Sequence, residues 1–252
     1  MNEHYRKLIA QEFQNCVNGT IMRVNSKKSE LRPFHTALLS EEVLFWSAFE
    51  RSFSTSFGQR VIEEVARLVA LSNGADEASR QRETYIEIDT VYETEIRHHM
   101  QGVRNHVKVE VLDHTLSDIL SKNKSGKTEK IRIISDLWWR KDGIDNYISL
   151  KTVKPNIDQA AVAKEDCLHL RIANPNCNAY FGLPYNPFGE RKADYAFNPP
   201  MNIFDFHNDP IVLIGRDMWD TIGGAGCYDE LLKIASEVGE KTKKEISALY
   251  NK

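Results

Sequence analysis

The pattern of apolar and polar positions in the first third of the chain is helical. In three segments apolar residues recur every three or four positions, which places them on one face of a helix. The predicted helices cover residues 4–17, a stretch that starts at Ser40, and residues 58–71. Residues 19–33 are polar and basic, and we expect a loop there. This part of the chain is therefore expected to contribute helices rather than strands.

Strand-like patterns begin further along. Residues 85–89 alternate after a polar connection at residues 75–82. Residues 131–139 and 147–153 are apolar runs joined through Asp142-Gly143, a dipeptide typical of tight hairpin turns. The remaining predicted elements are strands at residues 179–183 and 210–215 and helices at residues 157–170, 216–222 and 229–238. Mixed strands and helices favour an α/β fold, with a central mixed β-sheet flanked by helices in a single domain of residues 1–252.

Length and composition restrict the class of protein. The chain has 252 residues, 41% of them apolar, which is sufficient for one substantial core. Its formal net charge of −3 excludes a globally basic nucleic-acid binder, so any contact with DNA must come from a local basic surface. No apolar run has the length needed to span a bilayer, and the four cysteines form no Cys-x-x-Cys pair. The first residues lack the apolar region of a signal peptide, so a cytoplasmic protein without a membrane span is expected.

Asp136 and Lys151 are the residues of greatest chemical interest. Asp136 lies in the first strand of the hairpin, and Ser149 and Lys151 share one face of the return strand, because side chains alternate along a strand. A carboxylate beside a lysine suits Mg²⁺, which binds one or two carboxylates and keeps several waters. The lysine would position an attacking water and stabilise charge on a phosphate. The simpler alternative is a structural ion pair between Asp136 and Lys151.

This hairpin resembles the motif of the PD-(D/E)xK nucleases, in which an aspartate is followed, after a turn, by Asp/Glu-x-Lys. Here the motif reads Asp136 and then Ser149-x-Lys151, so the second carboxylate is missing. One branch of restriction enzymes, which includes NgoMIV, shows the same Ser-x-Lys pattern and takes its acid from a following helix. Thirteen intervening residues after Lys151 lead to Glu165 in the predicted helix. The resemblance implies that Asp136 and Glu165 bind the metal, with Ser149 beside them in the space of the absent acid.

Longer blocks extend the resemblance. The segments SDLWWRKDG, ISLKTVKPNIDQ and GRDMWDTIGG are similar to those of type II restriction endonucleases of the TdeIII type, and the similarity covers residues 45–238. It implies a restriction-endonuclease-like fold, Mg²⁺-dependent cleavage of double-stranded DNA and a short GC-rich palindromic target such as GGNCC. Cutting both strands at a symmetric site needs two active sites, so a homodimer is expected.

Other residues are expected to assist the metal site or to contact DNA. Of the two acids on the third helix, Glu64 lies beside the apolar stripe and is favoured over Glu63 as an additional catalytic acid, although a solvated helix acid is the competing explanation. Asp166 points about 100° away from Glu165 around its helix and should matter less. Guanine is best read by arginine or lysine, and Asn or Gln can also read bases. The candidates for DNA contact lie in the loop at residues 184–200 and at the start of the catalytic helix: Arg191, Lys192, Lys154, Asn156 and Gln159.

Two other classes of function stay open. The first is a DNA-binding protein of the same fold that has lost catalysis, since the usual second acid is absent. The second is a structural or interaction protein without a DNA role. A zinc protein is not indicated, because no metal-ligand spacing connects the four histidines of the middle region, which are His98, His99, His106 and His114.

Overall fold

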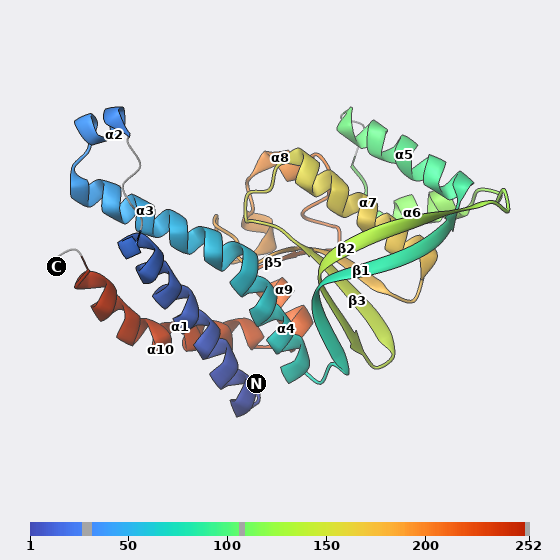
Figure 1. The fold of residues 1–252 in the computed structure, drawn as a ribbon. Coiled ribbons are helices and arrows are strands. Elements are labelled where there is room, and N and C mark those ends of the chain that lie inside the picture. The colour runs from blue at the N-terminus through green and yellow to red at the C-terminus, as the bar shows by residue number, and fades with distance from the viewer. Residues whose placement is uncertain (27–31, 106–108, 250–252) are drawn as a thin grey trace.

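A five-stranded mixed sheet forms the centre of the molecule (Figure 1). The computed structural model describes residues 1–26, 32–105 and 109–249. The strands of these residues lie in the order β1 (Glu77–Asp89), β2 (Thr128–Lys141), β3 (Ile144–Leu150), β4 (Asn178–Leu183) and β5 (Val212–Ile214). Strands β1, β2 and β3 are antiparallel neighbours, whereas β3, β4 and β5 run parallel. The predicted α/β class with a central mixed sheet is therefore confirmed.

Helices cover both faces of this sheet. In Figure 1, α1 (Glu3–Ser26), α3 (Glu41–Ser56), α4 (Ile62–Ser72) and α10 (Cys227–Ser247) gather on one side, and α5 (Thr90–Arg104), α6 (Leu112–Leu120) and α7 (Ile157–Ala173) lie on the other. The shorter helical elements are α2 (Pro33–Leu38), α8 (Asn198–Met201), α9 (Arg216–Gly223), the π turn η1 (Phe57–Val61) and the 3-10 turn η2 (Lys192–Asp194). None of the described helices is long and apolar enough to cross a membrane.

Two clusters of buried side chains fill the layers on either side of the sheet. One cluster lies under α5, α6 and α7 and includes Phe181, and the other lies under α1, α4, α9 and α10 and includes Ile9. Strand β2 contributes Ile133 to the first cluster and Leu137 to the second. Residues four apart in a regular strand point to the same face, so the alternation of side chains along β2 is interrupted between them. Asp136 lies within this stretch. That residues 1–252 act as one domain remains a prediction.

The pairing of β1 with β2 is interrupted at Gln81. Arg80 pairs with Leu137 and Arg82 pairs with Ser135, but Gln81 has no paired partner in the register between them. The backbone of Gln81 is left-handed, with φ of 48°. This conformation is uncommon for a residue with a side chain and costs free energy, so the surrounding structure must hold it. The interruption lies opposite Asp136 and sets the geometry of the site described below.

Strand β1 and helix α1 are longer than the hydrophobic pattern predicts. The polar connection expected at residues 75–82 is mostly strand, since β1 begins at Glu77 and runs beside β2. As an edge strand whose first residues are exposed or half-buried, it shows no alternation that sequence could reveal. The loop expected at residues 19–33 is helical as far as Ser26. Lys27 and Lys28, which were assigned to that loop, lie outside the described residues.

The second half of the chain follows the predicted pattern more closely. Helix α7 matches the predicted helix, and its start carries the predicted capping box of Asn156 and Gln159. The last helix is longer than predicted, because α10 continues to Ser247. The loop at residues 184–200 is mainly irregular, as expected, with η2 inside it and α8 at its end. Between β1 and β2 the structure adds α5 and α6, which the sequence did not resolve.

Candidate active site

The hairpin of β2 and β3 brings Asp136 and Lys151 into direct contact. Asp136 projects from β2, and Lys151 follows the last residue of β3. The Lys151 backbone N–H donates to the Gly182 carbonyl over 3.0 Å, which keeps this residue in line with β4. Its Nζ donates to Asp136 Oδ2 over 3.0 Å, and each of the two side chains is 20% exposed. The predicted proximity of these two residues is therefore confirmed, and both remain accessible to a substrate.

Gln81 links Asp136 to a second carboxylate. Its Nε2 donates to Asp136 Oδ1 over 3.1 Å and to Glu63 Oε1 over 3.0 Å. Side chains from α4, β1 and β2 thus converge beside Lys151. Burial and the neighbouring Asp136 raise the pKa of Glu63, and the hydrogen bond from Gln81 and the charge of Lys151 offset part of this increase. The amide therefore holds two carboxylates together that would otherwise repel each other.

Glu64, the acid favoured from the sequence, lies in a different environment. Its carboxylate accepts from Arg67 over 2.6 Å and pairs with Arg80 over 3.1 Å. Burial disfavours its charge, but the hydrogen bond from Arg67 and the charges of both arginines bring the net pKa of Glu64 below its usual value. Of the two acids, Glu63 is thus the one that Gln81 links to Asp136, and the catalytic role expected for Glu64 remains a prediction. Adjacent helical residues point about 100° apart, and the apolar stripe did not show which of the two lies toward Gln81 and Asp136.

Helix α7 carries two adjacent acids in different surroundings. Burial raises the pKa of Asp166 to about 7, with further contributions from the charges of Glu165 and Asp136 and an opposing one from Lys151. The carboxyl of Asp166 is thus within electrostatic reach of the Asp136–Lys151 pair. Glu165 is half-buried and lies instead beside Glu93 of α5 and its own helix neighbour His169. The metal-binding role expected for Glu165 remains a prediction.

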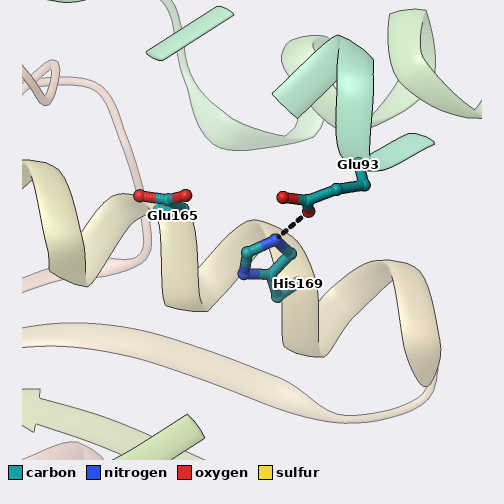
Figure 2. Close-up of side chains that lie close together, drawn as sticks. All are labelled: Glu93, Glu165 and His169. Atoms are coloured by element: carbon teal, nitrogen blue, oxygen red, sulfur yellow. Dashed lines mark hydrogen bonds and ion pairs between the residues drawn. The ribbon is translucent and has the colours of Figure 1, made fainter. Parts of the chain in front are cut away.

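The cluster of Glu93, Glu165 and His169 lies between α5 and α7 (Figure 2). One ligand atom of each side chain lies within 4.8 Å of those of the other two. His169 Nε2 and Glu93 Oε2 are hydrogen-bonded over 2.6 Å, and both side chains are buried. Arg97 donates to the other oxygen of Glu93 over 2.6 Å. None of these residues was linked to a metal site by sequence spacing, apart from Glu165.

The predicted DNA-contacting residues differ in how available they are. Asn156 and Gln159 each bond the backbone N–H of the other, so their side chains cap α7. Lys192 donates to the Asp209 carbonyl over 2.6 Å, and burial lowers the pKa of its amine. The side chain of Arg191 is 80% exposed, and among the described residues it pairs only with its neighbour Asp194. Lys154 is exposed, with Nζ 5.4 Å from the centre of the Phe188 ring. Arg191 and Lys154 are therefore the more available pair.

Ser149 lies on β3, where its backbone pairs with Phe181 of β4. Its side chain is half-buried, two residues before Lys151. The catalytic role assigned to it remains a prediction.

Three residues in the neighbourhood of Asp136 were not identified from the sequence, or were passed over. Gln81 carries no motif, and its left-handed backbone appears only in the structure. Asp166 was set aside because Glu165 matched the expected spacing, and Glu63 because it lies off the apolar stripe. Hydrophobic periodicity shows which face of a helix is buried, but it does not show which neighbouring element that face meets.

The donors around Asp136 fit a hard divalent cation. Asp136 and Glu63 offer carboxylate oxygens that Gln81 holds close together, and Asp166 lies within electrostatic reach of Asp136. Hard cations such as Mg²⁺ prefer oxygen ligands and need a site with room for several waters, which the partial exposure of Asp136 provides. The charge of Asp136 contributes to the raised pKa values of Glu63 and Asp166, and a bound cation would oppose that contribution.

Fold and site together define the class of protein. An aspartate in β2 and a lysine at the end of β3, within a mixed sheet flanked by helices, are consistent with the restriction-endonuclease-like α/β fold. The profile of the family described as type II restriction endonuclease, HinfI, matches residues 1–239, and the chain belongs to this family. Family membership implies a site-specific nuclease with DNA as its substrate.

Similar enzymes are found in Herpetosiphon aurantiacus. The type II restriction enzyme HgiEI is 30% identical over 250 residues, which cover 96% of this chain and 89% of that enzyme. The type II restriction enzyme HgiCII is 29% identical over 229 residues, covering 88% of this chain and 82% of that enzyme. HgiBI, another type II restriction enzyme, is 30% identical over the same length. These matches support a type II restriction endonuclease without singling out the TdeIII type.

Proposed function

We propose that this protein cleaves double-stranded DNA at a specific site by Mg²⁺-dependent hydrolysis of one phosphodiester in each strand. The observation that carries the proposal is the contact of Lys151 with Asp136 in an accessible site that also holds Glu63, with Asp166 within electrostatic reach. A purely structural ion pair would not need further carboxylates with raised pKa values around it. Within a family of type II restriction endonucleases, this cluster is the candidate for the hydrolytic centre.

The chain's own residues would divide the work as follows. Asp136 would hold the cation, together with a carboxylate from α7. Lys151 would release Asp136 Oδ2 and direct its Nζ to the attacking water or to a phosphate oxygen, where its charge stabilises the transition state. Gln81 would keep Asp136 and Glu63 in place. Bound there, Mg²⁺ would lower the pKa of a water and neutralise charge on the phosphate.

The acid supplied by α7 is the open choice within this mechanism. The electrostatic contact of Asp166 with Asp136 and Lys151 supports Asp166. The spacing resemblance to the NgoMIV branch supports Glu165, which remains the competing prediction. The two assignments differ by a rotation of about 100° around α7, so variants of both acids distinguish them.

For the target, we propose a short GC-rich palindrome such as GGNCC, which rests on the TdeIII resemblance. Guanines would be read in the major groove, with Arg191 and Lys154 as the first candidates and Lys192, Asn156 and Gln159 as the less available ones. A homodimer would present one active site to each strand. As a restriction enzyme, the protein would act in the cytoplasm.

The test is digestion of a plasmid of known sequence, followed by mapping of the DNA ends. We expect discrete fragments with Mg²⁺ or Mn²⁺ and none with EDTA. Ca²⁺ should support binding without cleavage, because it is larger and a poorer activator of water. Lys151→Ala is the matched negative control. Cleavage at full rate in EDTA would contradict the mechanism, and specific binding without cleavage under all conditions would favour the inactive DNA-binding alternative.

A further inference from the structure

We propose that Glu93, Glu165 and His169 form a second metal site, which takes a transition-metal dication such as Zn²⁺ or Mn²⁺ between α5 and α7. The proposal does not depend on how the hydrolytic centre works. It rests on three side chains whose ligand atoms all lie within 4.8 Å of one another. Figure 2 shows the carboxylate of Glu93 reaching across from α5 toward the two α7 residues.

The spacing of two residues within α7 allows both to bind the same metal ion. Glu165 and His169 are four residues apart, so they lie one helical turn apart on the same face. Zinc ligands lie roughly 2.0–2.2 Å from the ion, which places pairs of ligand atoms about 3 to 3.5 Å apart. Glu93 and His169 are closer than this, at 2.6 Å, because they are hydrogen-bonded to each other. Metal binding would replace that hydrogen bond with a small outward movement of both groups.

Charge also favours a cation at this point. The carboxylates of Glu93 and Glu165 lie beside the imidazole of His169. The Nε of Arg97 pairs with Glu93 Oε1 at 2.6 Å, on the oxygen that does not contact His169. Among the described residues, the structure gives Glu165 no hydrogen bond or ion pair. The arrangement of Arg97 behind Glu93 is also typical of metal sites, where ligating carboxylates are held by a second hydrogen bond. A bound dication would give the Glu165 carboxylate a partner of opposite charge and would leave the ion pair between Arg97 and Glu93 intact.

The donor set selects the class of metal. An imidazole nitrogen with two carboxylates suits zinc, manganese, cobalt or nickel, whereas Mg²⁺ prefers oxygen alone. The ligands come from α5 and α7, and Glu93 and His169 are only 5% and 4% exposed. The ion would therefore fasten α5 to α7 rather than meet a large substrate. Because Asp166 follows Glu165 directly, this link would also fix α7 beside Asp136.

The experiment is metal binding by the metal-free full-length protein and four variants. Native mass spectrometry counts bound Zn²⁺, calorimetry gives its affinity, and pulsed electron paramagnetic resonance of bound Mn²⁺ detects coupling to an imidazole nitrogen. The variants are His169→Gln, Glu165→Gln, Asp136→Asn and His98→Gln. The last removes an exposed histidine on the same α5 and is the matched control. Circular dichroism checks that each variant is folded.

We expect one Zn²⁺ and a nitrogen coupling in the wild type, in Asp136→Asn and in His98→Gln. His169→Gln should lose the nitrogen coupling, and both His169→Gln and Glu165→Gln should weaken Zn²⁺ binding by at least about 10-fold. If His169→Gln does not fold, Glu165→Gln alone decides through its affinity. Absence of nitrogen coupling in the wild type overturns the proposal. Its loss in Asp136→Asn would also do so, because the ion would then belong to the hydrolytic centre.

Discussion

Two clusters of acidic side chains include neighbouring residues of α7. They differ in solvent exposure and in the other side chains that they contain. Asp166 is within electrostatic reach of Asp136 and Lys151, whose side chains are each 20% exposed. Glu165 lies beside Glu93 and His169, which are buried. The first cluster also contains Lys151 and the amide of Gln81. The second contains the imidazole of His169, and Arg97 pairs with its Glu93.

This difference teaches how one helix can serve two tasks. Hydrolysis of DNA needs a site that admits a phosphate and a water and offers a movable positive charge, which Lys151 would supply in the proposed mechanism. Holding two helices together needs the opposite, a closed site whose ligands do not exchange with substrate. Variants of residues in each cluster test whether the two clusters have separate roles.

The largest effect is expected for Lys151→Ala. Single-turnover cleavage should fall by about 100-fold or more, because Nζ stabilises charge that develops at the phosphate. Folding and specific binding should persist, since the residue lies outside both apolar cores. Lys243→Ala, which removes an exposed lysine on α10, is the control. Loss of the fold in Lys151→Ala, seen by circular dichroism, would instead support a structural ion pair between Asp136 and Lys151.

A smaller effect is expected when the amide between the carboxylates is removed. Gln81→Ala and Gln81→Gly should both slow cleavage by about 10-fold, because Asp136 and Glu63 lose their shared donor. Glycine tolerates the left-handed backbone, so Gln81→Gly should be more stable than Gln81→Ala by about 1 kcal/mol in urea unfolding. Gln11→Ala on α1 is the matched control. If Gln81→Gly cleaves as fast as the wild type, the amide does not position the site.

The smallest effect concerns pH and stability without metal. Asp166 has its pKa raised to about 7 in the fold, so between about pH 4 and 7 the folded state keeps a proton that the unfolded chain has lost. Its contribution to stability is present at low pH and is lost as pH rises through 7. Replacement by asparagine should therefore help the protein more at pH 8 than at pH 5. Urea unfolding in EDTA at both pH values measures this, and an equal change at both would contradict the assigned pKa.

The hairpin that carries Asp136 and Lys151 could be predicted from the sequence because its pattern is local. Asp136, the Asp142-Gly143 turn and Lys151 lie within one short segment, so turn chemistry and strand alternation alone placed them together. The capping box at Asn156 was likewise set by residues three apart. Elements whose pattern depends on distant partners were missed, as β1 shows at its exposed start.

The rest of the site depends on contacts that spacing does not encode. Gln81 meets Asp136 across 55 positions of sequence, through a backbone conformation that glutamine rarely adopts. Glu93 meets His169 across 76 positions. Whether Glu165 or Asp166 faces the hairpin depends on the rotation of α7 against the sheet, and a shift of one residue changes that by about 100°.

The most direct test of the central claim compares single-turnover cleavage by Asp166→Asn and Glu165→Gln at saturating Mg²⁺ on the same DNA. The two variants remove one charge each from adjacent residues of α7. If Asp166 serves the hydrolytic centre, Asp166→Asn should lose about 100-fold in rate and Glu165→Gln less than about 10-fold. The reverse order, with the large loss in Glu165→Gln, would contradict the account and return the metal ligand to Glu165.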